Sequence, residues 1–146
     1  MADWIIRECR ADEADAVLTL WREAGASPSV TDSVDEICRA ILESPARFLV
    51  AESQGRLIGS VIGCFDGWRA NFYRLAVVPD YRRRGLARAL VAEIESWLIQ
   101  QGAKKIGALV ENDRPGSMAF WQAAGYRPDQ RIIRYVKMPK SLQSPP

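Results

Sequence analysis

Histidine is absent from this chain of 146 residues. Its absence excludes the Ser-His and Cys-His arrangements of most hydrolases and leaves Asp, Glu, Tyr, Lys and Cys for proton transfer. Cysteine is scarce, and Cys9, Cys38 and Cys64 are widely separated along the sequence. They outline neither a metal site nor a disulfide framework. We therefore expect no bound metal, cysteines that pack as small core residues, and a reducing, cytoplasmic location.

Long apolar runs and an excess of one charge are missing as well. No stretch approaches the ~20 apolar residues of a membrane-spanning helix, and the first residues lack the basic start and apolar stretch of a signal peptide. Lys and Arg together number 20, against 18 Asp and Glu. The net charge therefore gives no general reason to expect nucleic acid as a partner. With 48% apolar and 26% charged residues, the composition is that of a folded globular protein.

The order of periodic segments predicts an α+β domain with a mixed, mostly antiparallel sheet. Strand-like runs fall at residues 4–10, 47–52, 56–65, 71–78, 105–111 and 132–138. Helical runs fall at residues 12–24, 33–44, 86–101 and 116–124, with Asp12 and Ser33 as expected N-caps. Gly59 and Gly63, inside a strand, predict a bulge or a close backbone neighbour. We expect about six or seven strands flanked by four helices, one domain over residues 1–138, and a disordered tail over residues 139–146.

The segment of clearest chemical meaning is Arg82-Arg83-Arg84-Gly85-Leu86-Ala87, between an apolar strand and a helix. The first N–H groups of a helix have no intrahelical partner, and the helix dipole adds positive charge there. Gly85 lets an anion approach the backbone closely, and Ala87 keeps a second position small. A solvated basic loop that caps a helix is the alternative. The order strand, loop, glycine, helix favours a diphosphate site.

With its flanking elements, this loop resembles that of the GNAT superfamily of acetyl-CoA-dependent N-acetyltransferases. Arg82, Gly85 and Ala87 match the family pattern Gln/Arg-x-x-Gly-x-Gly/Ala. Residues 75–79 (LAVVP) are similar to the family's fourth strand, and residues 120–126 (FWQAAGY) to its closing helix. The element order agrees over residues 4–138. The resemblance is nearest to small bacterial members of unassigned substrate, and it implies one GNAT-like acetyltransferase domain.

The resemblance also implies the reaction and its binding residues. The acetyl group of acetyl-CoA would pass to a primary amine of a small molecule or peptide, by direct attack within a ternary complex. The backbone of Leu75 would polarise the thioester carbonyl, and the neighbouring strand backbone would bind the pantetheine arm. The loop amides would hold the pyrophosphate. The cofactor-binding residues that this predicts are Leu75, Ala76, Val77, Arg82, Arg83, Arg84, Gly85, Leu86, Ala87, Asn112 and Ser117.

The chain departs from the family pattern at two positions near its end. Trp121 stands where many relatives have the tyrosine that protonates the leaving thiolate. An indole is too weak an acid for that role, so Trp121 is better explained as a core side chain. Arg114 stands where relatives often have an asparagine. Either a local insertion brings Asn112 and Ser117 to the pantetheine, or Arg114 faces the cofactor.

The sequence also leaves the general base unassigned. Asn71 stands where some relatives have a glutamate, which leaves Tyr73, Glu111 and Asp66 as candidates. Strand alternation would place Tyr73 on one face with Leu75 and Val77. A half-buried strand tyrosine without a chemical role is the alternative.

Two other functions compete with acetyl transfer. The chain could be a non-catalytic acyl-CoA-binding module, which Trp121 favours. It could also contact RNA through Arg69, Arg74 and residues 82–84, a function that the low net charge disfavours. The acceptor pocket is expected from the first two helices and the loop at residues 26–32. A glycine-rich edge or an apolar helix face could support a homodimer.

Overall fold

The computed structural model describes residues 3–139, and the chain divides into two compact units between Leu109 and Val110. The first unit contains β1 (Ile5–Glu8), η1 (Ala11–Glu13), α1 (Ala14–Glu23), α2 (Val34–Leu42), β2 (Ala46–Ser53), β3 (Arg56–Phe65), β4 (Ala70–Val77), η2 (Pro79–Tyr81), α3 (Leu86–Gln100) and β5 (Ile106–Ala108). The second contains α4 (Pro115–Ala123). Within the described range, every helix is too short or too polar to cross a membrane.

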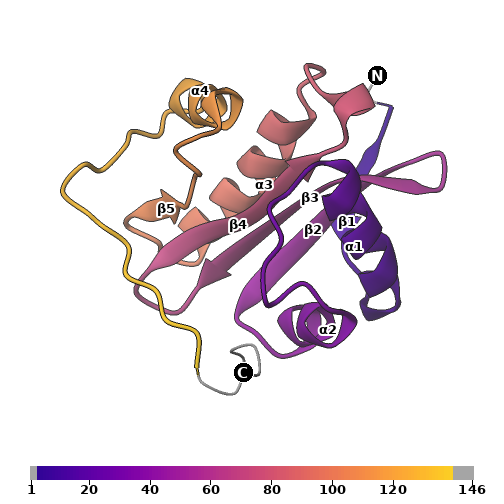
Figure 1. Ribbon diagram of the computed structural model, residues 1–146, viewed down its shortest axis with the longest axis horizontal. Coiled ribbons are helices and arrows are strands. Elements are labelled where there is room, and N and C mark those ends of the chain that lie inside the picture. Colours follow the sequence, from indigo (N-terminus) through magenta and orange to yellow (C-terminus); the bar gives the residue numbers. More distant parts are fainter. Residues whose placement is uncertain (1–2, 140–146) are drawn as a thin grey trace, which may run out of the picture. The chain divides into compact units, whose positions relative to one another are not determined.

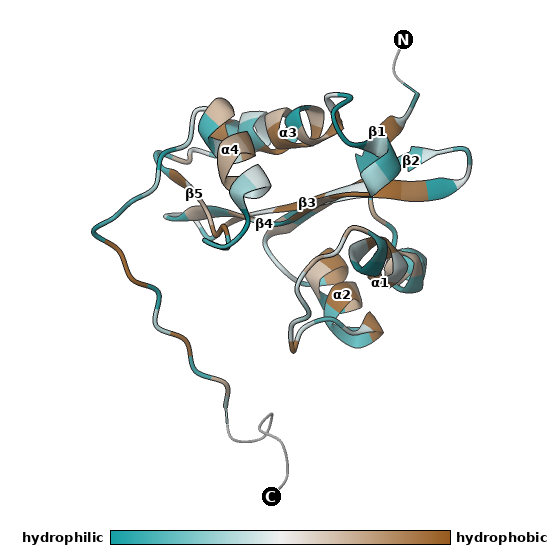
Figure 2. Cartoon of the chain, turned by 45° about the horizontal axis from the view of Figure 1, so that its top comes forward, coloured by the Kyte–Doolittle hydropathy of each residue, from teal (hydrophilic) through white to brown (hydrophobic). Residues whose placement is uncertain are grey.

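One mixed sheet organises the first unit, with five strands in the order β1-β2-β3-β4-β5 (Figure 1). The first three pairings are antiparallel, and β4 pairs with β5 in parallel. Helix α3 covers one face, and α1 and α2 cover the other (Figure 2). The predicted α+β fold with four helices and a mostly antiparallel sheet is confirmed.

Helix α3 packs very closely on the sheet because β3 has glycines beneath it. The α3 residues Leu86, Leu90, Ile94 and Leu98, spaced four apart, are at most 1% exposed. A Cβ at Gly59 would lie 3.1 Å from methyl groups of both Leu86 and Leu90, and one at Gly63 would overlap Cγ2 of Ile94. The close neighbour predicted for these glycines is therefore α3.

A bulge at Arg74 changes which face of the sheet the β4 side chains occupy. Ser60 pairs with Ala76 and Ile62 with Tyr73, so Arg74 and Leu75 together oppose Val61. Because a bulge inserts one residue, side-chain alternation shifts across it. Tyr73, opposite Ile62, lies on the face of α1 and α2, whereas Val77, opposite Gly59, lies on the face of α3. The expectation that Tyr73 and Val77 share a face is wrong.

Two local expectations differ from the structure. The described residues form five strands rather than six or seven, because residues 132–138 are extended but pair with no strand. Apolar side chains there are 50–91% exposed; alternation alone does not supply the ladder partner that a strand needs. Asp12, the expected N-cap, lies inside η1 instead: the N-caps of η1 and α1 are Arg10 and Glu13, and the Glu13 carboxylate accepts the N–H of Arg10 at 2.9 Å. The predicted tail lies beyond the described residues except for Pro139, and the single domain over residues 1–138 stays a prediction.

Candidate functional site

The loop between β4 and α3 presents a run of unpaired amides. The N–H groups of residues 83–87 donate no hydrogen bond to any other residue of the described range 3–139. Arg83 (φ 63°) and Gly85 (φ 87°) both have left-handed backbone conformations, and Gly85 is the N-cap of α3. Consecutive amides in such conformations form a concave anion site, and the helix dipole reinforces it.

Gly85 is required in this loop by its conformation rather than by crowding. A Cβ at this position would meet no atom within 4 Å, but an L side chain in the left-handed region is strained. The open space means that a ligand can reach the backbone of Gly85 directly. Leu86, 1% exposed, anchors the start of α3 in the core beneath the loop.

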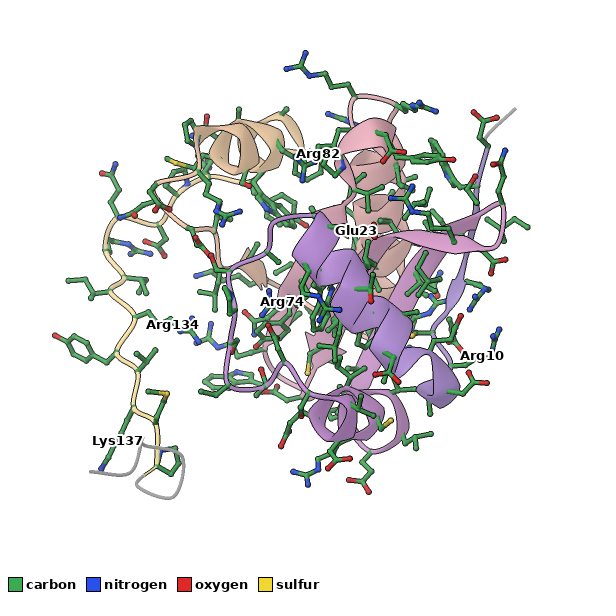
Figure 3. All side chains as sticks on the ribbon, turned by 45° about the vertical axis from the view of Figure 1, so that its right-hand side comes forward. Arg10, Glu23, Arg74, Arg82, Arg134 and Lys137 are labelled. Atoms are coloured by element: carbon green, nitrogen blue, oxygen red, sulfur yellow. The ribbon has the colours of Figure 1, made fainter. Side chains whose placement is uncertain are left out.

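The three loop arginines have different partners. Arg82 donates from Nε to the carbonyl of Val77 at 2.9 Å and from Nη2 to the carbonyl of Ala24 at 2.7 Å (Figure 3). Its guanidinium thus fastens the end of β4 to the end of α1. The Arg84 guanidinium lies over the Tyr81 ring, 4.8 Å from its centroid. Arg83 is exposed and forms no ion pair with another described residue, so its charge is available to an anion.

The backbone edge of β4 is open beside this loop. Strand β5 pairs only with residues 70–72 of β4, so among the described residues no strand neighbours β4 on that side from Arg74 to Val77. Val78 donates its N–H to the carbonyl of Ile58 at 3.0 Å. Because backbone direction alternates in an antiparallel pair, the N–H and C=O of Val77 point away from β3. The C=O accepts the Arg82 hydrogen bond described above, so the N–H is the group of Val77 that this edge offers to a ligand. The predicted cofactor residues Leu75, Ala76 and Val77 therefore lie on a strand with an open edge next to the amide loop.

A polar cluster that sequence reasoning missed lies behind the bulge. Trp21 donates from Nε1 to Oγ of Ser60 at 2.9 Å, and Ser60 donates to the carbonyl of Arg74 at 2.8 Å. The Arg74 guanidinium binds the Asp32 carboxylate at 2.7 Å. Arg74 is thus mostly buried and, like Arg82, already has partners, so these arginines do not form one exposed basic patch. The one sign of this polar cluster in the sequence is Arg74, a charged residue inside an otherwise apolar strand.

The candidate proton-transfer residues occupy different environments. Tyr73 is 42% exposed on the α1 and α2 face. The Asp66 carboxylate accepts amide hydrogen bonds from Arg69 at 2.7 Å and Trp68 at 2.8 Å. Those bonds lower the pKa of Asp66, which makes it a weak base. Burial raises the pKa of Cys9 to about 12, so this thiol is not a nucleophile at neutral pH.

The other predicted site residues belong to the second unit. Glu111 forms an ion pair with Arg114 at 3.2 Å. Asn112 precedes α4, and Ser117 lies in its first turn. Trp121 contacts the rings of Phe120 and Tyr126 edge-to-face, at centroid distances of 5.5 and 5.0 Å. These contacts agree with a packing role for Trp121, and the roles of Glu111, Asn112 and Ser117 stay predictions.

Comparison with known sequences places the chain in a family. Residues 14–126 match the acetyltransferase (GNAT) family, and the chain belongs to that family. It is 38% identical over 121 residues to an acetyltransferase of Pectobacterium atrosepticum, covering 83% of this chain and 86% of that one. It is 35% identical over 128 residues to an acetyltransferase of Sodalis glossinidius, covering 88% and 90%. The predicted enzyme class, an acyltransferase, is confirmed.

Solved structures share the fold. The aminoglycoside N-acetyltransferase AAC(6')-Iy in complex with CoA has a TM-score of 0.74 at 19% identity, covering 92% of this chain and 94% of that one. The PaiA N-acetyltransferase from Thermoplasma acidophilum, in complex with coenzyme A, has a TM-score of 0.74 at 18% identity, covering 84% and 88%. These similarities confirm the GNAT fold that the sequence predicts.

Proposed function

We propose that this protein transfers the acetyl group of acetyl-CoA to a primary amine, within a ternary complex and by direct attack. The observation that carries the proposal is the run of amides at residues 83–87, which have no partner among the described residues and lie at the start of α3. Acetyl-CoA is the cosubstrate of acetyltransferases in this family, and structural neighbours are complexes with CoA. That support favours the loop as the pyrophosphate site.

The binding groups suit the two halves of such a cosubstrate. Amide N–H groups at a helix start, with Arg83 beside them, suit a diphosphate because each bond is charge-assisted. The open backbone edge of β4 suits the amide-bearing arm, which can hydrogen-bond as an added strand does. Leu75, directly after the bulge at Arg74, would direct its backbone toward the thioester carbonyl and stabilise developing negative charge there.

The remaining chemistry is a proton removal from the amine. Acetyl-CoA, when bound, supplies a thioester with a good leaving group. The enzyme's own residues would orient the neutral amine and accept its proton as the N–C bond forms and the C–S bond breaks. Tyr73 and Glu111 are the proposed acceptors of that proton, directly or through water. No covalent enzyme intermediate is required, which suits a chain without histidine.

The acceptor is proposed as a primary amine of a small molecule or peptide. The structure of AAC(6')-Iy in complex with the bisubstrate analog CoA-S-monomethyl-acetylneamine supports an amine as the acceptor. A thiol-release assay with acetyl-CoA against polyamines, amino acids, aminoglycosides and peptides tests the reaction. Thiol release with at least one amine is expected. Tight acetyl-CoA binding without release for any amine would favour the non-catalytic binding module.

A matched pair of glycine variants tests the loop itself. Gly85 and Gly55 both have left-handed conformations, at φ 87° and 75°, and a Cβ at either meets no atom within 4 Å. Gly85→Glu and Gly55→Glu should therefore share a similar strain of about 1–2 kcal/mol. Only Gly85→Glu places a carboxylate in the anion site, so CoA affinity measured by calorimetry should fall at least ~100-fold there alone. Retained affinity in folded Gly85→Glu would overturn the proposed site.

A further inference from the structure

Arg74 has an uncommon backbone conformation for its residue type. Its φ of 52° lies in the left-handed region, which side chains other than glycine, asparagine and aspartate rarely adopt. It occupies the bulge of β4, directly before Leu75. A glycine would adopt this conformation without strain, so the arginine side chain must itself contribute something at this position.

The backbone of the bulge is fixed without the Arg74 side chain. The Arg74 carbonyl accepts a hydrogen bond from Ser60, whose hydroxyl in turn accepts one from Trp21. Ser60 is fully buried. These bonds tie the bulge to β3 and α1, so replacing the Arg74 side chain with hydrogen would leave the backbone anchored.

The Arg74 side chain instead holds the segment between α1 and α2. Nη1 donates to the carbonyl of Ser27 at 3.0 Å, and Nη2 donates to the Asp32 carboxylate at 2.7 and 2.9 Å. The guanidinium carbon lies 4.7 Å from the centroid of the Trp21 ring. Figure 3 shows Arg74 directed from β4 toward this segment. The Arg74 guanidinium therefore connects the bulge to both ends of the segment at residues 27–32.

Asp32, the other partner of this ion pair, is held in place by two further hydrogen bonds. Asp32 also accepts the N–H of Ser29 at 3.1 Å and donates its own N–H to the Ser29 carbonyl. The side chains of Arg74 and Asp32 are only 18% and 20% exposed. Because ion pairs shielded from water are screened less than surface pairs, this one can hold a loop in a single conformation.

We propose that Arg74 is a positioning residue for the acceptor amine. It fastens residues 27–32 to the β4 bulge, and so sets the wall of the acceptor site beside Leu75 without touching acetyl-CoA. The inference rests on the proposed function for its kinetic part and on the contacts above for its structural part.

Three variants test this assignment. Arg74→Gly removes the side chain and keeps the left-handed backbone, Arg74→Lys keeps the charge but not the planar fork, and Asp32→Asn removes the ion pair from the other side. We expect Arg74→Gly to raise the acceptor KM about 10-fold or more while the acetyl-CoA Kd changes less than about 3-fold. Arg74→Lys should have an acceptor KM between those of wild type and Arg74→Gly. The double variant Arg74→Gly with Asp32→Asn should have an acceptor KM no higher than that of Arg74→Gly alone, because the two substitutions remove the same ion pair.

A matched control and a second measurement separate this inference from the proposed function. Arg56→Ala removes ion pairs to Glu23 and Asp80 outside the segment and should leave the acceptor KM unchanged. Amide hydrogen exchange in residues 27–32 should speed about 10-fold in Arg74→Gly, while exchange in α3 stays as in wild type. If wild type releases no thiol with any amine, the proposed function fails, and the exchange result alone then decides whether Arg74 holds the segment. Unchanged exchange, an unchanged acceptor KM, or an equal rise in the acetyl-CoA Kd would each overturn the inference.

Discussion

Helix α3 lies so close to β3 that a single methyl group added at Gly63 should markedly lower the free energy of unfolding. A Cβ there overlaps Cγ2 of Ile94 and lies 3.3 and 3.5 Å from its Cδ1 and Cβ atoms. Ile94 is fully buried, and so are Leu90 and Leu98 on the same helix face. The branched methyl is attached directly to the Ile94 Cβ, so rotating the end of the side chain cannot relieve the overlap.

The size of the effect follows from two opposing contributions. Overpacking of a filled core costs about 1–3 kcal/mol, and the reduced freedom of the unfolded chain returns about 0.4–1 kcal/mol. Because the added Cβ overlaps Cγ2 of Ile94, the cost lies near the upper end of its range. We therefore expect Gly63→Ala to lower the free energy of unfolding by about 2 kcal/mol, which corresponds to a Tm decrease of roughly 6 °C for a chain of this size. Gly59→Ala is the matched control, since its nearest atoms are the flexible methyl ends of Leu86 and Leu90 at 3.1 Å. It should lower the free energy of unfolding by less than ~1 kcal/mol.

Urea unfolding followed by circular dichroism measures both variants, with the slope m expected to stay unchanged. Ile94→Leu moves the methyl branch away from Cβ, so the double variant with Gly63→Ala should regain at least about 0.5 kcal/mol relative to additivity. A Gly63→Ala protein within about 0.5 kcal/mol of wild type would refute the reasoning. A larger effect at Gly59 than at Gly63 would refute it as well.

Three further predictions concern charge and catalysis. The hydrogen bond from Arg7 lowers the pKa of Glu13 to about 2 from its ordinary 4.5, so its contribution to stability is fully present above pH ~4.5 and is lost as pH falls toward 2. Glu13→Gln should lower the free energy of unfolding by about 1–2 kcal/mol at pH 7 and flatten its dependence on pH in that window, as measured by urea unfolding; an unchanged pH dependence would contradict this. Arg83→Gly should weaken CoA binding about 3–10-fold in calorimetry, with the free energy of unfolding within ~0.5 kcal/mol of wild type, because glycine accepts the left-handed conformation. Tyr73→Phe should lower kcat about 10-fold or more and alter the pH–rate profile. An unchanged profile would remove Tyr73 from the mechanism.

Local signals in the sequence predicted most elements of the fold. The spacing of Leu86, Leu90, Ile94 and Leu98 marks α3 because a buried helix face repeats within a few residues. The hairpin of β2 and β3 follows from two apolar runs joined at Gly55, and the N-cap of α2 from Ser33, which accepts the N–H of Glu36 at 3.2 Å. The loop at residues 82–87 could likewise be predicted from the sequence, because the residues of its motif are contiguous.

Features that depend on distant partners could not be predicted in the same way. The bulge at Arg74 is stabilised by Ser60 and Trp21, and an arginine is not a residue that marks a left-handed conformation. The segment at residues 132–138 has strand alternation, but alternation carries no information on whether a neighbouring strand pairs with it. Local pattern therefore predicts the elements, whereas long-range contacts decide the faces of β4 and the number of strands.

The two contacts of Arg82 complicate the interpretation of mutational scans in this protein. Arg82 is the first residue of the loop motif, yet its guanidinium joins carbonyls of Val77 and Ala24, residues far apart in the chain. An alanine scan scored only by turnover would group Arg82 with the ligand contacts, because misfolded protein is also inactive. Folded protein must therefore be quantified for each variant before a motif position is assigned to binding. One contiguous motif therefore contains a residue that connects two elements of the fold and neighbours whose free groups face solvent.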